Sequence, residues 1–256
     1  MIYEHKFYVY TSDVNTDLLV TNKTILGWME DIGSLHSDHC GCGMATMEET
    51  RLSWVIIQWK LKIYRRMRYG ETITVKTWVP GTKRLYTFRE YAFYDEAGEL
   101  VAACSSKWVL TDLDKGMIHV PQWILDQYGM HTETVFEEGM NMDRIKEPEH
   151  FSQEYECTVP CTWIDVNGHM NNLYYLDVAY QALPIDLYMK NSFDEFEILY
   201  KRECKMFDRL HCYYDFDGTY HVVSIKNGED GKLHAVVRFP AAALVPSGKT
   251  ETEEEK

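Results

Sequence analysis

The hydrophobic pattern of the first half of the chain begins as a helix and continues as strands. Apolar residues recur at helical spacing between Ile25 and Leu35, and Thr21 or Asn22 can cap this helix. The next segment alternates polar residues with the apolar residues Val55, Ile57, Trp59, Leu61 and Ile63. Strands are predicted over 53–66, 71–79, 85–94 and 99–110. The pattern therefore predicts one helix followed by about four antiparallel strands.

The second half of the chain repeats this order. A helix that ends near Pro184 is marked by Leu173, Leu176, Tyr180 and Leu183. Strands are then predicted over 196–204, 209–218, 220–228 and 232–244. The sequence SDVN precedes the first helix and IDVN precedes the second, and DEAGELVAA late in the first half corresponds to GEDGKLHAV in the second. Such an internal repeat predicts two copies of one structural unit.

The repeat predicts two α+β domains in one chain. We expect an N-terminal domain over 1–128, a polar and acidic linker over 129–150, a C-terminal domain over 151–246 and an acidic tail over 247–256. A long antiparallel sheet wrapped around a central helix, present twice in tandem, resembles the hotdog fold. Single hotdog domains pair as dimers. The resemblance implies that a fused chain keeps the chemistry in one copy, while the other holds substrate.

Composition and charge narrow the classes of partner. Apolar residues make up 45% of the 256 positions, so there is ample material for a core. The 40 acidic and 26 basic residues give a formal charge of −14, which argues against nucleic acid or an anionic membrane as a partner. No stretch is long and apolar enough to span a membrane, and residues 1–20 show no secretory signal, so we expect a cytoplasmic location.

Seven scattered cysteines favour reduced thiols in a cytoplasmic protein. The cluster HSDHCGC brings together His36, His39, Cys40 and Cys42, but it lacks the C-x-x-C spacing of zinc sites. We favour a helix end followed by a Gly-rich turn, and we expect neither a metal nor a cofactor.

The sequence DVNGHMNN places polar side chains directly before the second helix. Asp165 can supply negative charge, while Asn167 and His169 can donate hydrogen bonds to an oxyanion, as thioester hydrolysis requires. The start of a helix adds backbone N–H groups. Asn171 or Asn172 can instead act only as a helix cap, and the loop alone leaves both interpretations open. The first half lacks the His and the paired Asn, so any site belongs to the second.

Several motifs resemble the fatty acyl-ACP thioesterase family of plants and bacteria. They are the D-x-N-x-H-x-N-N loop before an aromatic helix, YKREC at 200–204, the Gly-rich turn and W-V strand of GCGMATMEETRLSWV, the GETITVKTW segment and ACSSKWVL. The resemblance covers residues 2–245, with the motifs in the family's order. It implies hydrolysis of fatty acyl-ACP to free fatty acid and ACP, which ends chain elongation. The alternatives are an acyl-CoA thioesterase and a non-catalytic module that binds acyl thioesters.

By this resemblance, Asp165, Asn167 and His169 form the catalytic loop and Glu203 is the second acidic residue. Cys204 corresponds to a cysteine proposed as a papain-like nucleophile in the family. Glu203 and Cys204 are predicted to be neighbours on one strand. Adjacent side chains of a strand point to opposite faces, so only one of these two residues can reach the substrate. We favour the carboxylates and expect Cys204 to be a small buried residue.

The resemblance also implies an acyl carrier protein with a phosphopantetheine-linked acyl chain as the partner. Because such a carrier is acidic, we expect a basic patch to receive it. This carrier patch comprises Lys60, Lys62, Arg66 and Arg68 on one strand face, and a second basic cluster comprises Lys201, Arg202, Lys205 and Arg209. The residues expected to hold the acyl chain are Trp28, Met29, Trp54, Ile56, Trp59 and Trp78, although core packing explains most of them. A homodimer is left open.

Overall fold

The computed structural model describes residues 1–246, so the expected acidic tail at 247–256 lies outside the described residues. The chain divides into two compact units. The first unit comprises Met1–Ile145 and Glu197–Arg202, and the second comprises Lys146–Phe196 and the chain from Glu203 onward. Within the described part of the chain, no helix is long and apolar enough to cross a membrane.

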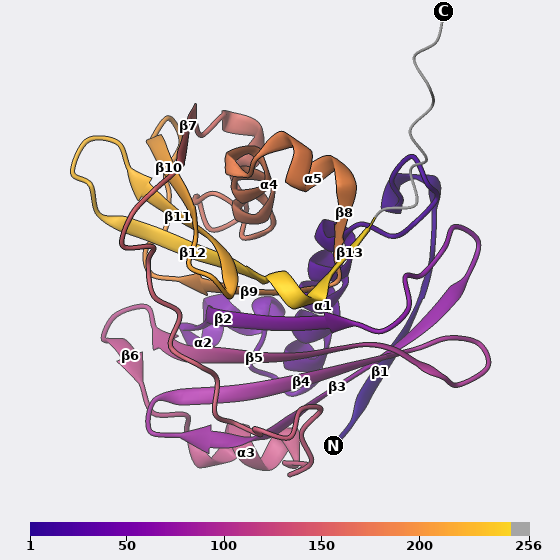
Figure 1. The fold of residues 1–256 in the computed structure, drawn as a ribbon. Coiled ribbons are helices and arrows are strands. Elements are labelled where there is room, and N and C mark those ends of the chain that lie inside the picture. Colours follow the sequence, from indigo (N-terminus) through magenta and orange to yellow (C-terminus); the bar gives the residue numbers. More distant parts are fainter. Residues whose placement is uncertain (247–256) are drawn as a thin grey trace, which may run out of the picture. The chain divides into compact units, whose positions relative to one another are not determined.

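The first unit is built on a mainly antiparallel sheet. Its strands follow the spatial order β1 (Tyr3–Tyr8), β3 (Thr72–Lys83), β4 (Tyr86–Tyr94), β5 (Leu100–Asp112), β2 (Leu52–Ile63) and β9 (Glu195–Tyr200). A short strand, β6 (Gly116–Ile118), pairs with β5. The long strands β2 to β5 lie side by side in Figure 1 and confirm the strands expected from the alternating pattern.

One long helix, α1 (Asn22–His39), accompanies this sheet, and Thr21 caps it by accepting the N–H of Thr24 at 3.1 Å. Its buried face contains Ile25, Trp28, Met29, Ile32, Gly33 and His36. Leu35 was expected on this face but is 40% exposed. It follows Ile25 by ten positions, which places it about 80° around the helix from that residue. Shorter elements of this unit are α2 (Met47–Thr50), α3 (Gln122–Tyr128) and the 3-10 turns η1 (Thr11–Asp13) and η2 (Met44–Thr46).

Strand β2 departs from strict alternation at a bulge. Val55, expected to be buried, is 44% exposed, whereas Ile56 is buried. The pairing of β2 with β5 shifts register between Ile56 and Gln58, and the extra residue changes which side chains face the core. From Trp59 onward the expected pattern holds, so the prediction was wrong only before the bulge.

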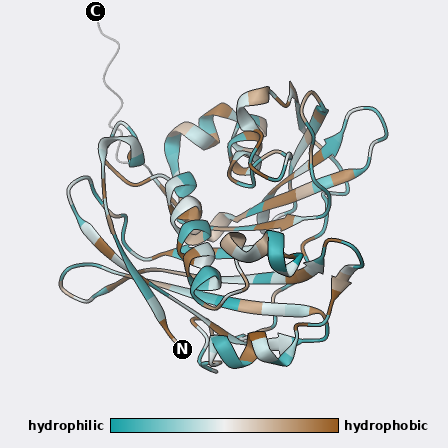
Figure 2. Cartoon of the chain, turned by 180° about the vertical axis from the view of Figure 1, so that it is seen from behind, coloured by the Kyte–Doolittle hydropathy of each residue, from teal (hydrophilic) through white to brown (hydrophobic). Residues whose placement is uncertain are grey.

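The second unit repeats this plan with shorter elements. Its antiparallel strands follow the order β12 (Leu233–Pro240), β11 (Tyr220–Asn227), β10 (Arg209–Phe216) and β7 (Gln153–Thr158). The helices are α4 (Leu173–Ala182) and α5 (Ile185–Lys190), the 3-10 turns are η3 (Cys161–Trp163) and η4 (Ala241–Ala243), and β8 (Asn191–Phe193) pairs with β13 (Leu244–Pro246). Helix α4 ends before Pro184, as expected. Apolar and polar residues alternate in bands along the strands (Figure 2).

Besides the three-residue strands β6, β8 and β13, two longer strands escaped the pattern-based prediction. These are β1 and β7, which open the two units and lie at the edges of their sheets. Most of their side chains are exposed and several are charged, so neither strand carries the period-two apolar signal of a half-buried strand. Edge strands of this kind are recognised from their pairing rather than from their composition.

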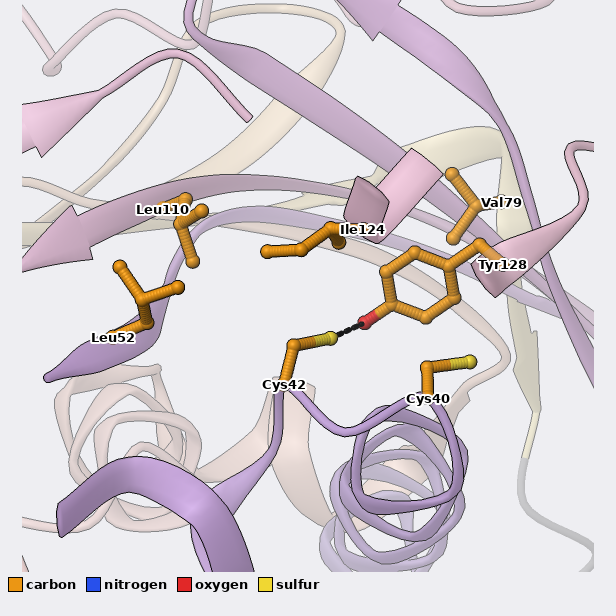
Figure 3. Close-up of a cluster of buried hydrophobic side chains, with 7 residues drawn as sticks. All are labelled: Cys40, Cys42, Leu52, Val79, Leu110, Ile124 and Tyr128. Atoms are coloured by element: carbon orange, nitrogen blue, oxygen red, sulfur yellow. Dashed lines mark hydrogen bonds between the residues drawn. The ribbon is translucent and has the colours of Figure 1, made fainter. Parts of the chain in front are cut away.

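The HSDHCGC segment forms the end of α1 and a tight turn. Arg89 Nη1 lies 2.9 Å from His36 Nδ1, and burial together with the nearby Arg89 charge lowers the pKa of His36 to about 2. Cys42 Sγ donates to the Tyr128 hydroxyl at 3.4 Å, inside a buried apolar cluster that also contains Cys40 (Figure 3). Over residues 1–246, no group of three or more His, Cys, Asp and Glu side chains is placed to hold a metal ion.

Residues 129–145, expected as linker, belong to the first unit and lie on one face of its sheet. Four residues that pair across neighbouring strands form a row on that face: Trp78, Glu90, Ser105 and Lys60. Trp78 Nε1 donates to the Glu133 carbonyl at 2.7 Å, and the buried Glu90 carboxylate accepts the N–H of Val135 at 3.2 Å. We call residues 129–145 the strap, because sheet side chains hold its backbone.

Candidate active site

The candidate loop is a tight turn that precedes α4 in the second unit. Ile164 pairs with Met170 as an antiparallel bridge across the base of the turn. Inside it, the N–H of Asp165 donates to the His169 carbonyl at 2.9 Å. Gly168 has φ 78°, the left-handed conformation that glycine adopts without steric cost. The local sequence thus folds Asp165 and His169 onto facing positions of one turn.

The carboxylate of Asp165 is held by its own loop. Its Oδ1 accepts the backbone N–H of Asn167 at 2.8 Å, and Asn167 Nδ2 lies 3.5 Å from its Oδ2. This is the local turn that a short acceptor side chain makes with the N–H two residues later. The contacts orient the carboxylate, and they bring Asp165 and Asn167 together as the sequence predicted.

His169 and Glu203 approach one another from separate segments of the second unit. His169 Nε2 lies 3.7 Å from Glu203 Oε1, and 37% and 54% of the two side chains are exposed. The backbones beside them are joined, because the N–H of Met170 donates to the Cys204 carbonyl at 2.8 Å. At 3.7 Å the two groups are too far apart for a direct hydrogen bond but close enough to share a water molecule. A pair of this kind can move a proton to or from that water.

Cys204 is fully buried, with 0% of its surface exposed. The strand that was expected to carry it is shorter than predicted, since β9 ends at Tyr200 and residues 203 and 204 lie in the turn that follows. The prediction of a strand there was wrong, yet Glu203 is exposed and Cys204 is not. The two side chains therefore differ in access to solvent, and the burial of Cys204 argues against its thiol as the nucleophile.

The N–H groups at the start of α4 donate hydrogen bonds within the chain. Asn171 Oδ1 accepts the N–H of Leu173 at 2.9 Å, so this residue has the capping role that the sequence left open. The N–H groups of Tyr174 and Tyr175 donate to the carbonyls of Asn171 and Asn172. The expectation that this helix start offers free N–H groups is therefore wrong for 173–175. Of the oxyanion donors expected from the sequence, the side chains of Asn167 and His169 therefore remain as candidates.

The first unit contains the same turn, but the two sequences align differently from the repeated DVN motif. Asn15 N–H donates to the Leu19 carbonyl at 2.9 Å, and Val14 pairs with Val20. These contacts match those of Asp165 with His169 and of Ile164 with Met170, at an offset of 150 residues. Asn15 therefore corresponds to Asp165, and the correspondence of SDVN with IDVN was wrong by two positions.

The corrected alignment shows that the first unit carries other residues at each site position. Asn15, Asp17 and Leu19 occupy the places of Asp165, Asn167 and His169. The turn after β2 matches the turn after β9, since Val20 N–H donates to the Met67 carbonyl as Met170 N–H does to Cys204. Arg66 and Met67 then occupy the places of Glu203 and Cys204. At these positions the first unit therefore lacks the residues that are expected to be catalytic in the second unit.

The residues of the carrier patch do not share one strand face. Strand β2 ends at Ile63, so Arg66 and Arg68 lie beyond it, and that expectation was wrong. Lys60 pairs with Glu138 of the strap. Arg66 Nη1 donates to the Val20 carbonyl at 3.1 Å and to Asn22 Oδ1 at 2.6 Å, at the start of α1. Lys62 and Arg68 are exposed. In the second basic cluster, Arg209 lies 3.6 Å from Glu156.

The apolar residues expected to hold an acyl chain lie in the core of the first unit. Those that are buried are Trp28, Met29, Ile56, Trp59 and Trp78, and Trp54 is partly buried against the apolar cluster of Figure 3. Trp59 packs between Tyr91 and Trp108, with ring centroids 5.6 and 5.5 Å away. Ordinary core packing therefore accounts for Trp59.

One contact of the site had no signal in the sequence. Tyr175, in the first turn of α4, accepts the N–H of Cys204 with its hydroxyl at 3.0 Å. It lies within an aromatic helix, where a tyrosine has the appearance of a core residue. Only the return of the chain after β9 brings Cys204 to it.

Comparison with known proteins agrees with this architecture. The model of the acyl-ACP thioesterase N-terminal domain matches residues 1–128, and that of the C-terminal domain matches residues 146–236. Oleoyl-acyl carrier protein thioesterase 1, chloroplastic, of Arabidopsis thaliana is 24% identical over 223 residues, which are 80% of this chain and 61% of that protein. The chain thus spans about three fifths of the length of this curated relative.

Two solved structures share the fold. An acyl-ACP thioesterase from Bacteroides thetaiotaomicron superposes with a TM-score of 0.81 at 24% identity, covering 93% of this chain and 97% of that one. The 12:0-ACP thioesterase from Umbellularia californica gives a TM-score of 0.82 at 18% identity, covering 96% and 98%. These likenesses confirm the expected α+β hotdog fold. With both family models matched in order along the chain, the protein belongs to the acyl-ACP thioesterase family.

Proposed function

We propose that the chain hydrolyses the thioester of fatty acyl-ACP and releases a free fatty acid and ACP, which ends chain elongation. The observation that carries this proposal is the approach of His169 to Glu203 beside the loop that orients Asp165. The corresponding positions of the first unit hold none of these residue types. Family membership supports the same reaction class.

In the proposed reaction, Glu203 accepts a proton from a water molecule, and the oxygen of that water attacks the thioester carbonyl carbon. Asn167 and His169 donate hydrogen bonds to the carbonyl oxygen as it becomes an oxyanion. The carbon–sulfur bond then breaks, and the proton passes to the departing phosphopantetheine thiolate. Thioester and water are thereby converted into carboxylic acid and thiol.

Asp165 supplies negative charge at the reacting centre in this scheme. In a second route its carboxylate attacks the carbonyl directly and forms a mixed anhydride, which water then hydrolyses to the acid. The hydrogen bond from the Asn167 N–H fixes the carboxylate orientation that either route needs. Cys204 takes no part in either, because its thiol is buried.

We assign the acyl chain to the first unit and the chemistry to the second. The support is the set of residues Asn15, Leu19 and Arg66, which leave the first loop without the imidazole and carboxylate pair.

All seven cysteines lie in the described part of the chain and are free thiols, which supports a reducing compartment such as the cytoplasm.

We propose Lys62 and Arg68 as the part of the carrier patch that contacts an acidic carrier protein. Both side chains are exposed, whereas those of Lys60 and Arg66 are only partly exposed. Charge complementarity of this kind mainly accelerates encounter and sets specificity.

The proposal is tested by comparing turnover of one acyl chain attached to ACP and to coenzyme A. A higher kcat/KM on ACP is expected. Equal or faster turnover on coenzyme A would make the protein an acyl-CoA thioesterase. Recovery of an intact, bound acyl thioester with no release of acid would identify a binding module.

A further inference from the structure

We propose that Tyr175 is a positioning residue, whose hydroxyl holds the peptide between Glu203 and Cys204 so that the Glu203 carboxylate faces His169. This inference rests on the proposed function, because it assigns a role within that site. It concerns a buried residue of α4 that lies outside the candidate loop.

Two hydrogen bonds hold the backbone of Cys204, one on each of the peptides that meet at this residue. Tyr175 Oη accepts the N–H of Cys204 at 3.0 Å, and the Cys204 carbonyl accepts the N–H of Met170 at 2.8 Å. Because a peptide unit is planar, a hydrogen bond at the Cys204 nitrogen also restricts the backbone at Glu203. The second hydrogen bond reaches the residue directly after His169. Glu203 and His169 are thus aligned through their backbones.

Backbone alignment matters here because the Glu203 side chain has little packing of its own. It is 54% exposed and lies 3.7 Å from His169 Nε2. Tyr175, in contrast, is 2% exposed and sits on α4, so it offers a rigid reference for the turn. A rigid supporting residue beneath a mobile acid or base is the usual means of keeping a reacting group in position.

The first unit serves as an internal comparison. Its loop and turn make the same main-chain contact, between Val20 N–H and the Met67 carbonyl. The residue 150 positions before Tyr175 is Ile25, which is fully buried and has no hydroxyl. The shared fold is therefore formed without this hydrogen bond. It occurs in the unit that carries Glu203, and not where Arg66 replaces that residue.

The first test replaces Tyr175 with Phe, which removes one oxygen and keeps the ring. We expect kcat for acyl-ACP to fall about 10- to 100-fold, with KM changed by less than about 2-fold, since alignment rather than binding is lost. Tyr214→Phe is the matched control. It deletes the hydroxyl of another buried tyrosine of the same unit, which bonds His221 Nδ1 at 2.9 Å, and should leave kcat unchanged.

A double variant separates positioning from general stability. If Tyr175 acts through Glu203, adding Tyr175→Phe to Glu203→Gln should lower kcat by less than about 2-fold further. If kcat of the double variant falls by the product of the two single fold-losses, the inference is overturned. An unaltered kcat in folded Tyr175→Phe would overturn it as well.

A measurement on the unaltered protein needs no variant to fold. Amide hydrogen exchange should show the Cys204 N–H protected, and exchange as fast as in an open turn would overturn the proposed contact. This readout also separates two failures. Absence of acyl-ACP hydrolysis in the unaltered protein would contradict the proposed function, whereas an unprotected Cys204 amide would contradict the role of Tyr175 alone.

Discussion

The polar residues of the loop before α4 hold the shape of that loop. Asp165 Oδ1 accepts the Asn167 N–H, and in the first unit Asn15 Oδ1 accepts the N–H groups of Asp17 and Leu19 at 3.0 and 3.1 Å. An asparagine therefore holds this turn in the same molecule. A carboxylate at position 165 is not required for the shape of the loop, which points to its charge as the reason for its presence.

The imidazole of His169 is expected to be needed for turnover. His169→Ala should lower kcat for acyl-ACP by roughly 100-fold or more, because it removes both the partner of Glu203 and a donor to the oxyanion. Leu19→Ala, at the corresponding position of the first loop, is the control and should retain turnover. Equal losses in the two folded variants would show that the effect comes from loop stability.

Cys204 is expected to be dispensable for the reaction. Cys204→Ser keeps a small side chain in the buried position and leaves its backbone hydrogen bonds in place, so turnover should stay within about 10-fold of the unaltered protein. Steady-state kinetics on a variant with an unchanged circular dichroism spectrum provide the measurement. Complete inactivity of that folded variant would favour a cysteine nucleophile.

At the scale of elements, the sequence predicted those helices and strands whose apolar residues recur at a regular spacing. Helices α1 and α4 and the long strands β2 to β5 follow from regular spacing of apolar residues. The bulge in β2 could not be predicted, because it depends on how β5 pairs with it. The edge strands β1 and β7 lacked a period, and the repeated DVN motif was aligned two positions away from the register that the hydrogen bonds define.

The strap covers the buried carboxylate of Glu90 on β4, which accepts the N–H of Val135. Burial raises the pKa of Glu90 to about 7, against opposing hydrogen bonds from Ser105 and Val135 and with a further increase from the charge of Glu138. Because the pKa of Glu90 in the folded state lies above its ordinary value of 4.5, the folded state binds this proton more tightly than the unfolded chain does. Stability should therefore fall as the pH rises through this interval, and the loss is complete above the folded pKa.

Glu90→Gln tests this linkage, because glutamine is neutral at every pH of interest. Relative to the unaltered protein, the free energy of unfolding of the variant should increase between about pH 5 and pH 8 by on the order of 1–3 kcal/mol. Urea titrations at several pH values give the difference. A difference that does not change with pH would show that Glu90 is not protonated more readily in the folded state.

At the scale of the whole molecule, net charge and local charge act in opposite directions. The chain carries −14 formal charges, so an acidic carrier is repelled at long range and must find a local basic region. Four residues were grouped from the sequence, but strand β2 ends before two of them. Sequence spacing could not foresee that Lys60 meets Glu138 or that Arg66 meets Asn22, since both partners are distant along the chain.

Removing the two exposed charges should weaken encounter with the carrier. Lys62→Ala combined with Arg68→Ala should raise KM for acyl-ACP several-fold at low salt and should leave KM for acyl-CoA nearly unchanged. The effect should shrink as salt is added. An equal increase for both substrates would remove these residues from the carrier surface.

The proximity of the candidate loop residues was easier to predict than the contacts around them. Asp165, Asn167 and His169 are close in sequence, so their proximity was foreseeable, and Glu203 was added through the family resemblance. Its approach to His169 depends on the turn after β9, which the predicted strand over 196–204 did not contain. The contact from Tyr175 to Cys204 spans 29 residues and has no signature in composition or periodicity.

The central claim is thioester hydrolysis at the loop of the second unit, and Asp165→Asn tests it most directly. Asparagine at the corresponding position 15 already supports this turn, so the variant should fold and lose only the charge. The measurement is release of free fatty acid from a series of acyl-ACP chain lengths by the unaltered protein and by the variant. We predict release by the unaltered protein and a loss of roughly 100-fold or more in the variant. Equal release by both proteins, or none by the unaltered protein, would contradict the account.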